Sequence, residues 1–204
     1  MPDVSESHGR FWEAIARKGP ARAACDAGAE AEGGRILLPL AGIRYSVDPG
    51  ARTVRREGPE GPTEAGFSES VVLVSHLALA DGSPRAGEWV SEKGLDLGDV
   101  FFRPPHRLPA GELASRFGLD PEGFLRAARA LGGREIRGGD RAAEIPALPR
   151  VPLRVLLWLG DEEFPEADAR FLFDRSASRN LLPDGILTLV WIVEKRLLEA
   201  ARAL

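Results

Sequence analysis

Hydrophobic residues recur along the chain with two different periods, and the change between them separates predicted helices from predicted strands. Residues 8–18 place aromatic and aliphatic side chains at the spacing of one helical face. A second helix begins at Pro20, because proline is tolerated in the first helical turn, and Gly33-Gly34 closes this region. We therefore expect residues 1–32 to form a helical segment that packs on a main domain of residues 33–204.

Alternation with a period of two residues follows and predicts β-strands. Three short segments separated by turn residues predict an antiparallel meander, namely Arg35–Leu40, Ile43–Val47 and Arg52–Arg56. Two later apolar runs, Leu153–Leu159 and Arg170–Phe173, predict a hairpin. The first of these runs is apolar at nearly every position, which is typical of a strand covered on both faces.

Helical periodicity returns in the middle of the chain and at its end. It predicts four more helices, at Val71–Ala80, Pro109–Phe117, Asp120–Leu131 and Pro183–Ala203. Short strands are expected at Glu88–Val90, Arg134–Arg137 and Ala142–Leu148, the last at a sheet edge because prolines interrupt it. The predicted fold class is α+β, with an antiparallel sheet built from the N-terminal meander and the C-terminal hairpin, packed by helices and closed by a long C-terminal helix.

Charge and composition narrow the classes of partner. The net charge is −4 and the sequence pI is about 5.5, which argues against nucleic acid, because phosphate binding needs a clustered basic face. The apolar run Ile186–Val193 is shorter than the ~20 residues that span a bilayer. Cys25 is the only cysteine, and the first residues lack an apolar signal core. We expect a cytoplasmic protein with no membrane partner.

One long stretch and several shorter motifs carry a family resemblance. Residues 148–183 read LPRVPLRVLLWLGDEEFPEADARFLFDRSASRNLLP. Upstream lie Phe11-Trp12, GRILLPLAGIRYSV, His76-Leu77, GEWV, ALGG and Gly139-Asp140. Together they resemble the domain of unknown function 3786 family over nearly the whole chain.

This resemblance implies a source among bacteria and archaea and a role in anaerobic metabolism. Some similar proteins carry a cysteine-rich iron–sulfur domain like that of corrinoid proteins, which this chain lacks. The resemblance associates the family with a corrinoid or another tetrapyrrole as cofactor, and the lack of that domain makes the association weaker for this chain.

The acidic turn between the two hairpin strands is the first candidate site. Asp161, Glu162 and Glu163 follow one another, and neighbouring carboxylates raise one another's pKa unless a cation compensates. A divalent metal site or an acid–base pair would use such a cluster. The alternative is a solvated hairpin end, in which Pro165 opens a helical turn whose start favours acids. Both interpretations stay open.

Two further residues complete the set of candidate ligand or metal residues. His76 lies among apolar neighbours in a predicted helix, where it is either a hydrogen-bonded core histidine or a ligand. Asp140 follows Gly138-Gly139 in a predicted turn. If the acidic turn belongs to a metal-assisted enzyme, its carboxylates should converge with His76 or Asp140.

No catalytic constellation is recognisable in the sequence, since no glycine-flanked serine elbow and no histidine pair with metal-ligand spacing occur. The leading hypothesis is an accessory protein that binds a small molecule or cofactor between the sheet and the acidic turn. The first alternative is the metal-assisted enzyme that uses Asp161–Glu163. The second is a structural subunit that docks on a protein partner, or on a second copy of itself, through helix 183–203. Whether the protein is an enzyme is left open by these patterns.

Overall fold

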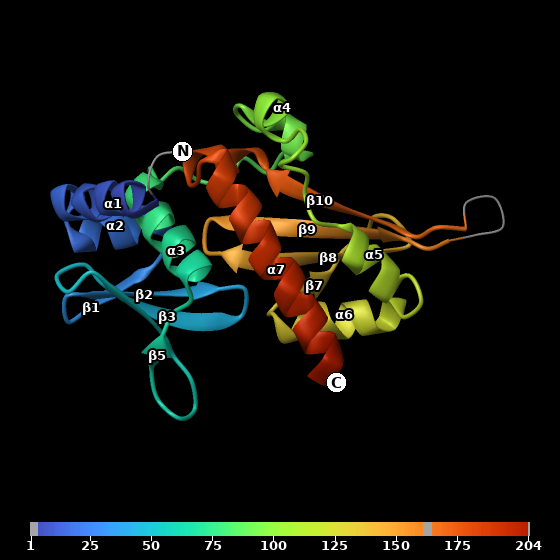
Figure 1. Ribbon diagram of the computed structural model, residues 1–204, viewed down its shortest axis with the longest axis horizontal. Helices are drawn as coiled ribbons and strands as arrows, with labels where there is room; N and C mark the ends of the chain where they lie inside the picture. Colours follow the sequence, from blue (N-terminus) through green and yellow to red (C-terminus); the bar gives the residue numbers. More distant parts are fainter. Residues whose placement is uncertain (1–3, 161–164, 204) are drawn as a thin grey trace.

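The computed structural model describes residues 4–160 and 165–203, and within them the chain forms two antiparallel sheets that share one set of helices (Figure 1). The strand order is β1-β2-β3-β4-β5 in the first sheet and β6-β10-β9-β8-β7 in the second. The α+β class is therefore confirmed. The meander and the hairpin belong to separate sheets, whereas the sequence predicted a single one.

The first sheet is a meander of strands that are neighbours in sequence. Its members are β1 (Glu30–Glu32), β2 (Arg35–Leu40), β3 (Ile43–Asp48), β4 (Thr53–Arg56) and β5 (Thr63–Glu64). The turn between β2 and β3 uses two residues with positive φ, Ala41 at 43° and Gly42 at 83°. A Cβ on Gly42 would lie 2.9 Å from the Cα of Leu131, so this turn can sit against the end of a helix only with glycine there.

The second sheet is built around the predicted hairpin. Its strands are β6 (Trp89–Val90), β7 (Arg134–Glu135), β8 (Arg141–Leu148), β9 (Val151–Trp158) and β10 (Asp168–Asp174). The prediction that the first hairpin strand is covered on both faces is wrong, because Arg154, Leu156 and Trp158 remain partly exposed. Helices cover only the other face, and on the open face guanidinium groups stack on indole rings. Arg154 lies 3.8 Å from the ring centre of Trp89.

Strand β8 does not lie at the edge where the sequence placed it. The short strand β7 pairs with it at Ala143 and Glu144. The pairing with β9 becomes irregular between Ile145 and Leu148, where Pro146 falls. Because β7 has already ended there, the missing N–H of Pro146 breaks no ladder.

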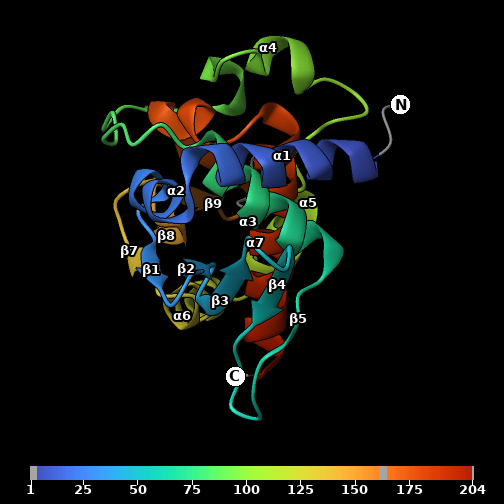
Figure 2. The same cartoon turned by 90° about the vertical axis from the view of Figure 1, so that its left-hand side faces the viewer.

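The helices pack around and between the two sheets. They are α1 (Val4–Lys18), α2 (Pro20–Ala27), α3 (Phe67–Leu79), α4 (Gly98–Phe101), α5 (Gly111–Phe117), α6 (Pro121–Ala130) and α7 (Pro183–Ala203), with 3₁₀ turns η1 (Glu92–Gly94) and η2 (Arg175–Arg179). α7 crosses the molecule between the sheets and contacts α3, α5 and α6 (Figure 1). Figure 2 shows α1 and α2 lying over α3, on the side of the first sheet. None of the described helices is long and apolar enough to cross a membrane.

The apolar stripe of α7 is largely consumed by packing within the chain. Ile186, Leu189, Val190, Val193 and Leu197 are all buried. The segment 93–108 contains only the end of η1 and the single turn of α4 as regular structure. The N-terminal helices continue directly into β1, so the chain enters the first sheet at Glu30.

Candidate functional site

The acidic turn lies outside the residues that the structure describes, which stop at Gly160 and resume at Pro165. The metal or acid–base role of Asp161, Glu162 and Glu163 therefore remains a sequence-based prediction. Among the described residues, no group of three or more histidine, cysteine, aspartate or glutamate side chains is placed to hold a metal ion.

His76 and Asp140 occupy opposite parts of the molecule. His76 is fully buried in α3, with Nε2 3.2 Å from the carbonyl oxygen of Ala27. Burial lowers the pKa of this imidazole to about 4, so it is neutral at pH 7. Asp140 is exposed, and its carboxylate accepts the N–H of Leu159 at 2.8 Å, which fastens the turn before β8 to the end of β9. α3 and that end of β9 lie at opposite sides of Figure 1, so the fold does not bring the two residues together.

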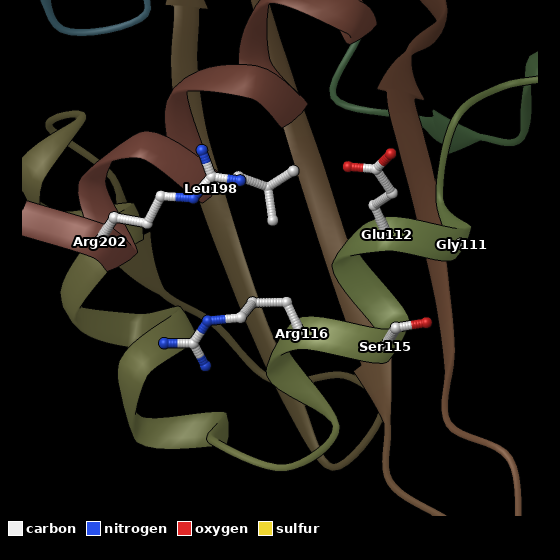
Figure 3. A pocket seen from close by; sticks show the side chains of 6 residues that line it. All are labelled: Gly111, Glu112, Ser115, Arg116, Leu198 and Arg202. Carbon is white, nitrogen blue, oxygen red and sulfur yellow. The ribbon is translucent and has the colours of Figure 1, made fainter.

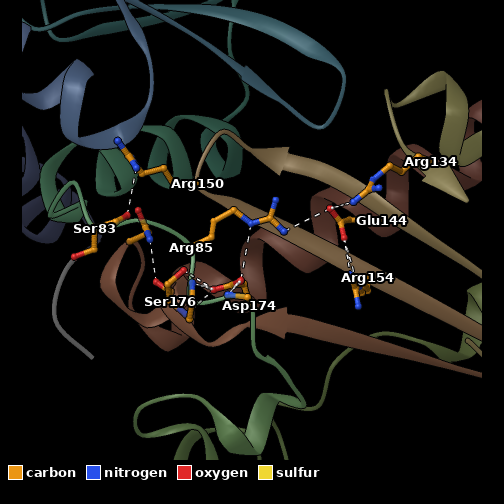
Figure 4. A network of polar contacts seen from close by, with 11 residues as sticks. Ser83, Arg85, Arg134, Glu144, Arg150, Arg154, Asp174 and Ser176 are labelled. Atoms are coloured by element: carbon orange, nitrogen blue, oxygen red, sulfur yellow. Dashed lines mark hydrogen bonds and ion pairs between the residues drawn. The ribbon is translucent and has the colours of Figure 1, made fainter. Parts of the chain in front are cut away.

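A network of buried carboxylates and arginines marks the second sheet. The carboxylate of Glu144 on β8 accepts hydrogen bonds from Arg85, Arg134 and Arg154 at 3.4, 3.0 and 3.1 Å, respectively. Figure 4 shows Arg85 reaching between Glu144 and Asp174. Burial would raise the pKa of Glu144, but the hydrogen bonds and charges of the arginines outweigh it and hold that pKa below its usual value. Through Arg85, which pairs with both Glu144 and Asp174, this network attaches the loop of Arg85 to the sheet.

Asp174, at the end of β10, ties down the same loop. Its carboxylate accepts the N–H groups of Ala86 and Gly87 at 2.9 and 2.8 Å. It also accepts the N–H and hydroxyl of Ser176 at 3.0 and 2.6 Å. Asp174 is completely buried, and although burial opposes ionisation, these donors lower its pKa. Oδ1 accepts three of these hydrogen bonds and Oδ2 accepts one, so this buried carboxylate organises the loop.

The best-formed candidate site is a cavity between the start of α3 and the outer side of α7, here called the α3–α7 cavity. Its volume is about 450 Å³. Four elements line it, namely β3, β4, α3 and α7, and the lining residues are Ile43, Arg56, Gly66, Phe67, Ser68, Glu69, Trp191, Ile192, Lys195, Arg196 and Glu199. The volume falls within the range of ~300–1,000 Å³ that is usual for small-molecule sites.

The floor of the α3–α7 cavity is a polar triad of Tyr45, Glu69 and Arg196, in which Tyr45 and Arg196 are buried and Glu69 is partly buried. Arg196 donates to the carboxylate of Glu69 at 2.6 Å and to the hydroxyl of Tyr45 at 2.5 Å. Its other terminal nitrogen donates to the carbonyl oxygens of Leu40 and Ala41. The guanidinium therefore joins α7 to the β2–β3 turn and to α3.

Glu69 is held as an ionised acceptor. Tyr45 donates to one of its oxygens at 2.6 Å, and the N–H of Gly66 donates to the other at 3.0 Å. Burial alone would raise the pKa of Glu69, but the hydrogen bonds from Tyr45 and Arg196 lower it. Burial and the bond to Glu69 raise the pKa of Tyr45, so the phenol keeps its proton and donates. With both oxygens occupied, Glu69 is suited to positioning Arg196 and poorly suited to taking a proton from a ligand.

The mouth of the α3–α7 cavity presents aromatic and cationic side chains. Phe67 is 63% exposed and Trp191 is 54% exposed, although each has a large apolar surface. Lys195 pairs with Glu199 at 3.8 Å along α7. Arg56 has no ion pair with any residue in the described part of the chain. After the pairs Arg196–Glu69 and Lys195–Glu199 are set aside, one unbalanced positive charge faces the cavity.

The sequence model of one protein family, described as a domain of unknown function (DUF3786), matches residues 19–196 of the chain. The chain belongs to this family. The DUF3786 match contains every lining residue of the α3–α7 cavity except Glu199. No curated protein and no solved structure matches the chain.

Sequence patterns did not single out the residues of the α3–α7 cavity, although they contained a signal for part of it. The wide apolar stripe of the last predicted helix includes two charged positions, Glu194 and Arg196, and both are buried. A charge on an apolar helical face predicts a buried partner. The partner Glu69 lies more than a hundred residues earlier, and periodicity gives no indication of which distant segment supplies it.

Proposed function

We propose that this DUF3786 protein binds a small planar ligand that carries one negative group, and that the ligand occupies the α3–α7 cavity. The observation that carries the proposal is the combination at the cavity mouth, where two exposed aromatic side chains stand beside an unbalanced cation. Aromatic faces stack on planar rings, and a guanidinium pairs with carboxylate or phosphate in a fork.

The floor of the cavity supports the same proposal. Arg196 and Glu69 are fixed before a ligand arrives, because each is hydrogen-bonded on several sides. Preorganised polar groups lose little freedom on binding, so more of the interaction energy appears as affinity. A cavity of about 450 Å³ favours a ligand with one or two fused rings over a whole tetrapyrrole.

The proposal describes a cytoplasmic accessory protein whose described lining residues contribute recognition. Family resemblance motivates testing cofactors of anaerobic metabolism beside common metabolites. A suitable panel contains mononucleotides, flavin mononucleotide, aromatic carboxylates, haem and a corrinoid.

Thermal unfolding of the full chain with each member of this panel tests the proposal. A ligand at one hundred times its Kd should stabilise the folded state by about 2.7 kcal/mol, which raises Tm by several degrees. We expect Arg56→Gln and Trp191→Leu each to weaken binding at least fivefold. Arg55→Gln on the same strand and Leu182→Ala just before α7 are the matched controls, since both residues are exposed and neither lines the cavity.

Two results would overturn the proposal. The first is that no planar anion in the panel raises Tm. The second is a rise that the Arg56 and Trp191 variants retain in full, because the ligand would then sit elsewhere.

A further inference from the structure

A second hollow lies beside β10 of the second sheet, beneath α4. We call it the α4 groove. It is bounded by η1, by α4 with the loop that leads to α5, and by residues 169–172 of β10, and its volume is about 810 Å³. Figure 1 shows α4 projecting beyond the β10 side of this sheet.

Four cationic side chains from three separate segments line the α4 groove. Lys93 comes from η1, Arg103 and Arg107 from the loop after α4, and Arg170 from β10. All four are exposed. Lys93, Arg103 and Arg107 are close in the sequence, and the fold brings Arg170 of the distant strand β10 to them.

These cations are weakly committed to the protein itself. Lys93 and Arg107 have no ion pair with any residue that the structure describes. Arg103 donates to a main-chain carbonyl oxygen, that of Asp99, at 2.6 Å. The pair of Arg170 and Asp168 at 3.0 Å is exposed on both sides, and pairs of that kind contribute little.

The lining carries a net positive charge. Two carboxylates, Glu92 and Asp99, stand against the four cations, which leaves the groove at +2 on a chain whose net charge is −4. Neither carboxylate pairs with a cation in the described part of the chain. An acidic protein repels anions at long range. The local excess of positive charge in the α4 groove therefore favours anions at this one surface.

The floor of the α4 groove is apolar. Phe102 and Phe171 are buried there, and Leu108 and Ala110 are partly buried. A low-dielectric floor strengthens the attraction between the rim cations and an anion that leaves bulk water.

We propose that the α4 groove binds a compact polyanion, with two or more phosphate or carboxylate groups that pair with Lys93, Arg103 and Arg107. This site is separate from the α3–α7 cavity and takes a ligand of higher charge. The arginines supply planar forks that match both phosphate and carboxylate, while Lys93 supplies a point charge. The two chemistries share this recognition, and the probes of the test distinguish between them.

Isothermal titration calorimetry of the full chain in a low-salt, phosphate-free buffer tests the proposal. Citrate serves as the carboxylate probe and inorganic tripolyphosphate as the phosphate probe. We expect one-to-one binding of at least one probe, and affinity that falls as salt is added. The double variant Lys93→Gln/Arg107→Gln should bind that probe at least tenfold more weakly.

The control is the double variant Arg55→Gln/Arg137→Gln, which removes the same charge from exposed residues outside the groove. It should bind within twofold of the unchanged protein. The proposal would be overturned if neither probe binds, or if the two double variants weaken binding equally. Arg56→Gln, which perturbs the α3–α7 cavity, should leave this titration unchanged, so the two sites can fail independently.

Discussion

Replacing Glu194 with glutamine should stabilise the protein at pH 8 and leave its stability almost unchanged near pH 4.5. Glu194 lies on α7, is 4% exposed, and makes no hydrogen bond to another side chain or to the main chain within the described residues. Burial, and to a lesser extent the carboxylate of Glu112 on α5, together raise its pKa to about 7. Figure 3 shows Glu112 beside the cavity that separates α5 from α7.

The magnitude follows from the change in pKa on folding. Because the folded state holds the proton more tightly, Glu194 contributes stability below pH 4.5 that is lost as the pH rises through about 7. A shift from 4.5 to about 7 corresponds to roughly 3 kcal/mol when the group is fully ionised. Water that reaches the carboxyl lowers this figure, so we expect about 1–3 kcal/mol. Glutamine keeps the shape of the side chain and removes the titration.

Chemical unfolding of the wild type and of Glu194→Gln at pH 4.5, 6, 7 and 8 measures the effect. The difference in unfolding free energy should be near zero at pH 4.5 and should grow steadily to pH 8. Glu199→Gln is the control on the same helix, since Glu199 is exposed, and its difference should stay within about 0.5 kcal/mol at every pH. A difference for Glu194→Gln that does not vary with pH would refute the reasoning.

Three further outcomes are expected. His76 acts in the opposite sense, because burial lowers its pKa from 6.5 to about 4. Stability is therefore lost as the pH falls from 6.5 to about 4. His76→Leu should flatten the acid side of a plot of unfolding free energy against pH. Asp174→Asn should lower the free energy of unfolding in urea by about 2–4 kcal/mol, because the new amide NH₂ group must face N–H donors. Asp168→Asn, at an exposed position on the same strand, should lower it by less than about 0.5 kcal/mol. Glu69→Gln should lower the free energy of unfolding by about 2–4 kcal/mol, because it leaves Arg196 without its counter-charge. The same change at exposed Glu64 should be nearly neutral. Equal effects at the two sites would contradict the triad of Tyr45, Glu69 and Arg196.

Local signals were sufficient to predict most elements of the fold. Asp120 before Pro121 predicts a capped helix that begins with proline, and its carboxylate does accept the N–H of Gly123 at 2.8 Å. Ala41-Gly42 between two apolar segments predicts a tight turn, which two positive φ angles confirm. These features depend on residues close in sequence, and for that reason they can be derived without knowing the packing.

Features set by distant packing could not be derived in this way. The apolar run of β9 predicts a strand that is covered on both faces. The sequence alone does not show whether a helix covers a face or whether an arginine guanidinium stacks on a tryptophan ring there. The α3–α7 cavity depends on Tyr45, Glu69 and Arg196, which come from three separate elements. The alternation of Ile43, Tyr45 and Val47 predicts that Tyr45 faces a core, but it carries no information about which charge meets Tyr45 there.

The position of α7 between the sheets has a consequence for biosynthesis. Strands of the first sheet pair with neighbours in sequence, so this sheet can form while later segments are still being translated. Helix α7 leaves the ribosome last among the described elements, yet it supplies Arg196 to the β2–β3 turn and packs on α3 and α6. Until then the nascent chain exposes the apolar surfaces that α7 will cover, and that interval is when chaperones would protect it from aggregation.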